Sequence, residues 1–316
     1  MGKISFANSN NKTIMMSAVI NFPEGFDEKK RYPAIVVSHP GGGVKEQTAG
    51  TYARKFAQNG FITIAYDASY QGESSGEPRQ LENPHIRTED VSAVVDYLTT
   101  LPYVDRDRIG GMGICAGAGY TANAAINDPR IKAVGTVSMV NIGQMFRNGF
   151  TGDVKSGDAS PLLASGANAR TAEATGGEVN KMPLAPMRKE DAPNADLEEA
   201  WEYYHTPRAQ YPTAPGWATA RSLSQIIPYD AFTYAEVFLT QPLMLVVGDA
   251  AGSKWMSDDL LKRAASKNKH MHIVKGSNHM KLYDVEKYVD EAVSVLGPFF
   301  RTHLANADTA RRVAAE

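Results

Sequence analysis

The sequence predicts an α/β protein in which a mostly parallel sheet carries helices on both faces. Short apolar runs, typical of strands buried on both faces, alternate along the chain with amphipathic segments of helical spacing. Such alternation joins parallel strands through helical crossovers, so the helices cover both faces of the sheet. The alternation stops near residue 141 and resumes near residue 241, which predicts an insertion.

The expected strands are rich in β-branched and aromatic residues and are bounded by Gly, Pro or Asn. They are residues 3–7 and 13–21, which read as a hairpin, and residues 34–38, 61–66, 109–114, 133–140, 243–249 and 270–274. The expected helices begin after a capping residue or a turn and end near Gly or a polar residue. They are residues 48–59, a helix capped by Thr88, residues 116–127, a helix capped by Ser257, and residues 285–304.

The insertion, residues 141–240, shows no clear strand and is rich in Ala, Gly, Pro and Met. One helix is predicted in it, begun by a capping box of Asp196 and Glu199 and running to His205. Its many Trp, Tyr and Phe residues argue against disorder, so we expect a helical cap with residues 151–194 as its most mobile part. The expected division is a core of residues 1–140 and 241–305, a cap of 141–240 and a tail of 306–316.

Composition narrows the function. The 316 residues carry a formal charge of −2 and a single cysteine. This balance gives no reason to expect a nucleic-acid or membrane partner, and the N-terminus does not read as a signal peptide. A lone cysteine cannot form an internal disulfide, so we expect a cytoplasmic protein. No cofactor or metal site is expected, and the chain could form a homo-oligomer.

Cys115 stands at the centre of the predicted site, within Gly113-Ile114-Cys115-Ala116-Gly117. A strand that turns sharply into a helix holds its central residue in a strained conformation and leaves no room for side chains beside it. The helix N-terminus then favours the thiolate, which predicts a nucleophile. The alternative is a buried structural cysteine, because free Cys is among the most buried residue types.

His279 is the predicted general base, since it lies in the loop after the last strand. Asp249 is the predicted acid that orients His279, because it is the first carboxylate after its strand. A surface or helix-capping role for Asp249 is the alternative, and residues 250–253 (Ala-Ala-Gly-Ser) occupy the places where an acid would also be expected. His39 and His85 are the nearest rivals to His279.

The oxyanion hole is expected to combine the backbone N–H of Ala116 with that of Gly42 or Gly43, in the glycine run after the strand at 34–38. A phosphate-binding loop is the alternative reading of that run. The Gly-x-x-x-x-Gly-Lys-[Ser/Thr] pattern is absent there.

These features together resemble the α/β-hydrolase superfamily over nearly the whole chain. The Gly-Ile-Cys-Ala-Gly turn is similar to that of dienelactone-hydrolase-type enzymes with a cysteine nucleophile. Residues 39–46, 67–74 and 101–105 resemble a bacterial and fungal group that includes polyketide transferases. The resemblance implies an eight-stranded, mostly parallel sheet with an inserted helical cap, and acyl chemistry through a thioester.

The expected function is therefore hydrolysis of an ester, thioester or lactone through an acyl-enzyme on Cys115, with His279 as general base. One alternative is an acyltransferase that passes the acyl group to an acceptor alcohol. The other is a catalytically silent protein that uses the same fold to bind a ligand.

Overall fold

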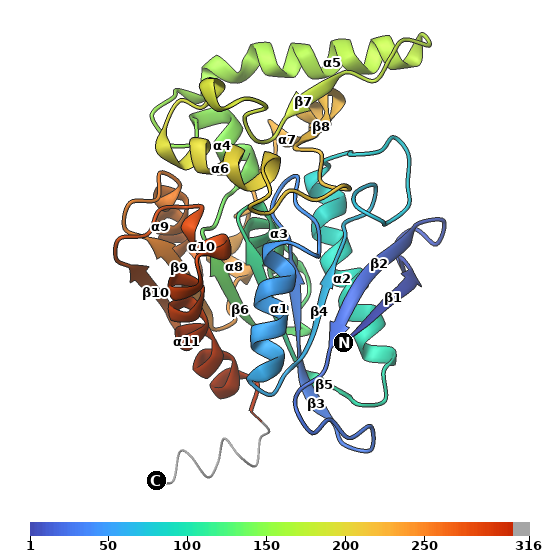
Figure 1. The fold of residues 1–316 in the computed structure, drawn as a ribbon, viewed down its shortest axis with the longest axis vertical. Coiled ribbons are helices and arrows are strands. Elements are labelled where there is room, and N and C mark those ends of the chain that lie inside the picture. The colour runs from blue at the N-terminus through green and yellow to red at the C-terminus, as the bar shows by residue number, and fades with distance from the viewer. Residues whose placement is uncertain (306–316) are drawn as a thin grey trace.

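An eight-stranded, mostly parallel sheet forms the centre of the computed structural model, which describes residues 1–305 (Figure 1). Its spatial order is β1-β2-β4-β3-β5-β6-β9-β10. The strands are β1 (Gly2–Ala7), β2 (Met15–Asn21), β3 (Tyr32–Ser38), β4 (Ile62–Tyr66), β5 (Val104–Ile114), β6 (Ile131–Val137), β9 (Leu243–Gly248) and β10 (Lys269–Val274). Strand β2 runs antiparallel to both of its neighbours, whereas β4 to β10 pair in parallel. The predicted fold class is confirmed.

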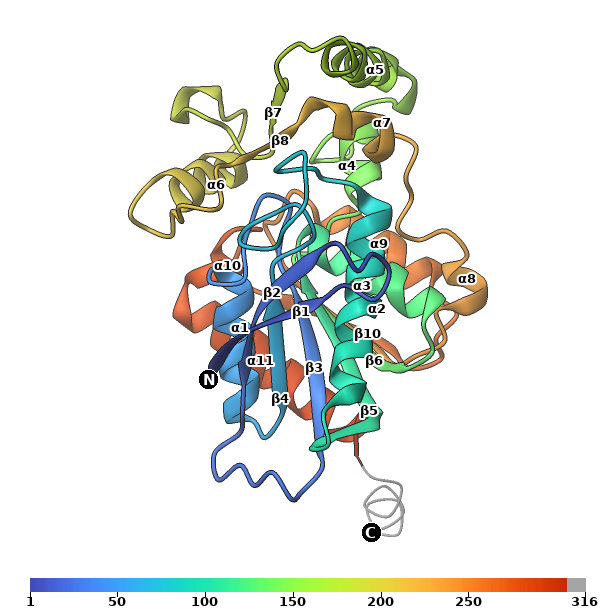
Figure 2. The same cartoon turned by 90° about the vertical axis from the view of Figure 1, so that its right-hand side faces the viewer.

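Helices pack on both faces of this sheet, as Figure 2 shows from the side. Helices α1 (Thr48–Gln58), α10 (Lys281–Asp284) and α11 (Glu286–His303) bury apolar side chains against one face. The other face carries α2 (Pro84–Thr100), α3 (Ala116–Asn127), α8 (Ala235–Phe238) and α9 (Lys254–Arg263). Among residues 1–305, no helix combines the length and the apolar character that a membrane crossing needs.

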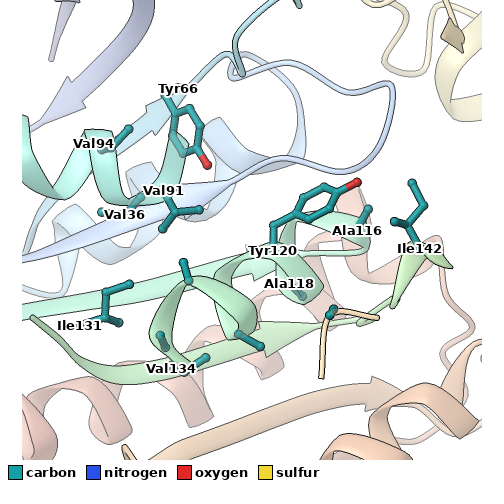
Figure 3. Packing of buried hydrophobic residues seen from close by; sticks show 14 of the residues in the cluster. Val36, Tyr66, Val91, Val94, Ala116, Ala118, Tyr120, Ile131, Val134 and Ile142 are labelled. Carbon is teal, nitrogen blue, oxygen red and sulfur yellow. The ribbon is translucent and has the colours of Figure 1, made fainter. Parts of the chain in front are cut away.

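The core beneath α2 and α3 fixes the base of the site. Val36 of β3, Val134 of β6, Val91 of α2 and Ala118 of α3 are fully buried there (Figure 3). Tyr120 of α3 extends from the same cluster toward the carboxyl ends of the strands and places its hydroxyl on buried Glu82 at 2.6 Å. Near the carboxyl ends of the strands, the cluster therefore borders two polar groups, of Tyr120 and Glu82, that are already hydrogen-bonded to each other.

The inserted segment lies beyond the carboxyl ends of the strands (Figure 1). It contains α4 (Ile142–Asn148), η1 (Ser156–Ala159), α5 (Ser160–Ala174), β7 (Lys181–Pro183), η2 (Lys189–Asp191), α6 (Ala195–His205), β8 (Trp217–Thr219), η3 (Ala220–Ser222) and α7 (Leu223–Ile226). Strands β7 and β8 form a small antiparallel sheet that the sequence pattern did not indicate. Helix α5 was also missed, because it buries only Gly166 and Ala169 and has no apolar stripe. The predicted tail, residues 306–316, lies outside the described residues.

Three predicted helix starts are corrected by the structure. Asn83, not Thr88, caps α2, and its side chain accepts the N–H groups of the first turn. Asn194, not Asp196, caps α6 in the same way. Helix α9 begins after Ser253 rather than at Ser257, and the Ser253 side chain makes no capping bond. The side chains of Ser253 and Asp196 are bonded elsewhere.

Candidate active site

Cys115 lies at the turn between β5 and α3 with φ +55° and ψ −125°. A non-glycine residue rarely adopts this conformation, which costs on the order of 1–3 kcal/mol. Close packing imposes it. A Cβ on Gly113 would lie 2.2 Å from the carbonyl oxygen of Gly117, and one on Gly117 would lie 2.4 Å from the carbonyl oxygen of Ser38. The two glycines thus allow the turn that points the thiol away from the sheet.

Two backbone N–H groups face the thiol and form a candidate oxyanion hole. Both Ala116 and Gly41 bring their N–H groups within hydrogen-bonding reach of Sγ. The sequence predicts that Gly42 or Gly43 supplies the second N–H group of the oxyanion hole. In the structure this N–H group is that of Gly41. The N–H of Gly43 is used in a turn, donating to the carbonyl of Pro40 at 3.1 Å, and Gly42 packs against Leu184.

Buried polar side chains hold the loop that carries Gly41. His39 Nδ1 contacts the carbonyl of Pro40 at 2.7 Å, and His39 Nε2 accepts the N–H of Ala68 at 3.2 Å. Arg87 donates to the His39 carbonyl at 2.7 Å. Burial and the Arg87 charge hold the pKa of His39 well below its usual value, so its imidazole is neutral. The rival histidine His39 therefore supports the oxyanion loop, and His85 is exposed on α2.

Burial raises the pKa of the Cys115 thiol, even though the hydroxyl of Tyr283 and the two backbone N–H groups act in the opposite direction. The helix N-terminus was expected to favour a thiolate. In this structure desolvation is the larger effect. The resting side chain is a neutral thiol.

The hydroxyl of Tyr283 lies between His279 and Cys115 and contacts both side chains. The ring Nε2 of His279 lies 3.2 Å from that hydroxyl, which also hydrogen-bonds to the Cys115 side chain. Burial lowers the pKa of His279 to about 3, and the ring of Phe150 packs edge-on against it with centroids 5.2 Å apart. His279 is therefore neutral at pH 7 and is linked to the thiol by one intervening O–H.

Ser253 occupies the position of a third member. Its Oγ lies 2.6 Å from Nδ1 of His279, and the residue is fully buried. Asp249 is exposed, and its carboxylate accepts the N–H of Gly276 at 2.9 Å. The predicted partnership of Asp249 with His279 is corrected on this geometry: the orienting group is a hydroxyl four residues further along the β9–α9 loop.

Asp196 ties the inserted segment to the histidine. One carboxylate oxygen accepts the N–H of His279 at 2.9 Å, and the other accepts the N–H of Gly252 at 2.8 Å. Gly252 precedes Ser253, so a single side chain from α6 holds both loops that carry the histidine and its partner. Glu199, one turn later on α6, accepts from Asn278 at 2.8 Å.

Sequence reasoning missed Gly41, Tyr283, Ser253 and Asp196 as site residues. Tyr283 follows His279 by four residues on one helical turn, a spacing that places two side chains side by side. Ser253 lies in the loop where the sequence predicts a carboxylate as the partner of His279. The glycine run was the signal for Gly41, although the choice among its glycines was wrong. The role of Asp196 had no local signal, since it depends on a contact between segments far apart in the chain.

The parallel sheet, the sharp turn at Cys115 after β5 and the histidine after the last strand are the arrangement of an α/β-hydrolase. A family model described as X-Pro dipeptidyl-peptidase (S15 family) matches residues 12–243. The chain belongs to this family. The predicted resemblance is thereby confirmed for the superfamily, while the likeness to dienelactone hydrolases and polyketide transferases stays a prediction.

Three proteins illustrate the similarity. The uncharacterized protein YcjY of Escherichia coli K12 is 70% identical over 302 residues, which cover 96% of this chain and 99% of that protein. The crystal structure of hypothetical protein PA2218 from Pseudomonas aeruginosa has a TM-score of 0.87 at 33% identity, covering 96% of this chain and 93% of the other. Thiohydrolase aneE of Aspergillus aculeatus is 30% identical over 156 residues, or 49% of this chain and 47% of that enzyme.

Proposed function

We propose that this protein is a hydrolase that cleaves an ester, thioester or lactone through an acyl-enzyme on Cys115. One observation carries the proposal. The Cys115 sulfur lies at a strained turn, faces the N–H groups of Ala116 and Gly41, and is joined to the neutral imidazole of His279 through the hydroxyl of Tyr283. A nucleophile, an oxyanion hole and a base are therefore contiguous.

Acylation begins with two coupled proton shifts. The thiol gives its proton to the Tyr283 oxygen while the Tyr283 hydroxyl gives its own proton to Nε2 of His279, whose Nδ1–H donates to Ser253. Burial raises the pKa of Tyr283 well above its usual value, so the phenol stays neutral before and after the step. The result is a thiolate and an imidazolium, each stabilised by the other.

The thiolate then attacks the substrate carbonyl, forming a C–S bond, and the carbonyl oxygen gains negative charge beside the N–H groups of Ala116 and Gly41. Collapse of this intermediate breaks the bond to the leaving alcohol or thiol, which receives the proton from His279 through Tyr283. Water next attacks the thioester, passing a proton to His279 by the same route. Release of the carboxylic acid restores the neutral thiol.

The ester or thioester class fits this site better than the peptide named in the family description. A dipeptidyl-peptidase must hold the ammonium group at the substrate's N-terminus, which calls for a carboxylate with a free oxygen. Among the described residues lining the cavity at Cys115, the carboxylate is that of Asp196. Its two oxygens already accept the N–H groups of His279 and Gly252. The thiohydrolase relative supports a thioester as substrate.

Acyl transfer is the second candidate, because His279 is only 3% exposed and the inserted segment covers it. A covered acyl-enzyme meets little water and could last until an acceptor alcohol arrives. Product analysis with and without added alcohols separates the two: free acid in both cases indicates a hydrolase, and a new ester indicates a transferase.

Intact-mass spectrometry after brief incubation with p-nitrophenyl esters tests the proposal. Wild-type protein should gain one acyl group and release p-nitrophenol. Cys115→Ala should gain none, and His279→Ala should acylate at least about 100-fold more slowly, the contribution of a general base. A wild-type thiol that reacts with iodoacetamide but never acylates would overturn the proposal and favour the ligand-binding alternative.

A further inference from the structure

The cavity at Cys115 is small. Its free volume is about 60 Å³, enough for roughly four water molecules. The walls formed by Val140, Ile142 and Met280 are buried. Among the long apolar side chains that line the cavity, those of Met145, Phe150, Leu184 and Leu197 are partly exposed to solvent.

Those four side chains also line a second, larger hollow, here called the outer groove. The outer groove has a free volume of about 350 Å³ and lies within the inserted segment. Ala185 is the fifth residue that both hollows share. The wall between them is therefore a single layer of apolar side chains from α4, the loop after it, the segment after β7, and α6.

The outer groove is apolar along its length. Besides the shared wall it is lined by Phe146, Pro183, Pro186, Pro193 and one charged residue, Asp191. Asp191 is already paired with Arg188 at 2.6 Å. A ligand in this groove would gain free energy by burying apolar surface rather than by forming charge pairs.

We propose that the outer groove binds the distal part of the substrate's acyl chain, so that the substrate is an ester or thioester of an unbranched apolar acid too long for the inner cavity. The inference rests on the proposed function. The acyl carbon must lie at Cys115 with its oxygen at Gly41 and Ala116. A chain longer than the inner cavity accepts must continue past its wall, and the partly exposed apolar side chains of that wall also line the outer groove.

The test is a series of p-nitrophenyl esters from acetyl to dodecanoyl, assayed with wild type, Pro186→Asp and Pro193→Asp. Wild-type kcat/KM should rise by roughly two- to fourfold per added methylene as the chain enters the groove. Each Asp variant places a charge in the groove and should lower kcat/KM for the longest esters at least tenfold. The loss should shrink as the chain becomes shorter.

Met187→Asp is the matched control, because Met187 neighbours Pro186 and is exposed at 42%. It adds the same charge beside the groove and should follow wild type at every length. Equal losses at all lengths in both groove variants, or a flat length profile in wild type, would overturn the groove assignment. Failure of the wild type to acylate with even the acetyl ester would instead contradict the proposed function.

Discussion

The cysteine half of the candidate site, formed by Cys115, Ala116 and Gly41, differs from the histidine half, formed by His279, Ser253 and Tyr283, in the interactions that hold it in place. Backbone packing fixes the first, with glycines against carbonyl oxygens at the turn. Hydrogen bonds fix the second, and they come from two core loops and from Asp196 of the inserted segment. The turn at Cys115 is therefore set by packing within the core, whereas the position of the histidine depends on how the inserted segment docks.

The largest effect expected from breaking the first half is that of Gly117→Ala. The added methyl would lie 2.4 Å from the carbonyl oxygen of Ser38, so the turn must move and Cys115 with it. We expect loss of detectable acylation and about 2 kcal/mol of destabilisation, measured by mass spectrometry and urea unfolding. Gly157→Ala is the control, because a Cβ there meets no atom within 4 Å. Wild-type acylation by Gly117→Ala would show that packing does not set the turn.

Tyr283→Phe tests the hydroxyl that links the cysteine half of the site to the histidine half. It keeps the ring but removes the hydroxyl between Cys115 and His279, so the proton path is interrupted. The acylation rate should fall by about 10²–10³-fold with little change in KM. A solvent isotope effect present in wild type should shrink in the variant. An unchanged rate would mean that the thiol and imidazole exchange the proton directly.

Asp196→Asn weakens the histidine half from the inserted segment. The amide keeps one acceptor oxygen, while its NH₂ group faces a backbone N–H that needs an acceptor. Misplacement of His279 should lower kcat roughly tenfold. The matched Asp249→Asn should stay within about threefold of wild type, because among the described residues the Asp249 carboxylate hydrogen-bonds only to the N–H of Gly276. The reverse ranking would restore Asp249 as the acid.

The smallest expected effect is a change in how the free energy of unfolding depends on pH. The pKa of His279 is lowered from 6.5 to about 3 by burial, so between these values the unfolded chain binds a proton that the folded chain does not. This contribution is complete above pH 6.5, and stability falls as the pH drops, by up to about 1.4 kcal/mol per unit. His279→Gln should flatten the slope of urea stability between pH 6 and 5 by about 1 kcal/mol per unit. Exposed His85→Gln should leave it as in wild type; equal slopes in all three proteins would contradict the assignment.

Sequence patterns predicted the core well, because each strand and helix there carries its own periodicity. The turn at Cys115 was predictable for the same reason, since Gly113 and Gly117 are close neighbours in the chain. Which N–H completes the oxyanion hole was not, because the turn at Pro40 uses the N–H of Gly43 and no residue type records that choice.

The histidine half was harder to predict. Asp196 reaches His279 across 83 positions, and its place near the start of α6 also suited a capping role. Ser253 was passed over because a carboxylate was expected as the partner of His279. Helix α5 has no apolar stripe to predict it, since most of its surface faces solvent.

The raised pKa of the Cys115 thiol affects how fast this residue is oxidised. Peroxide and soft electrophiles attack thiolates, and a thiol that stays protonated reacts with them slowly. In the proposed mechanism Cys115 ionises as its proton moves toward His279, so an idle site would present a thiol that forms sulfenic acid slowly. The same burial that makes the cysteine slow to ionise would thus also slow its oxidation by peroxide until a carbonyl substrate arrives.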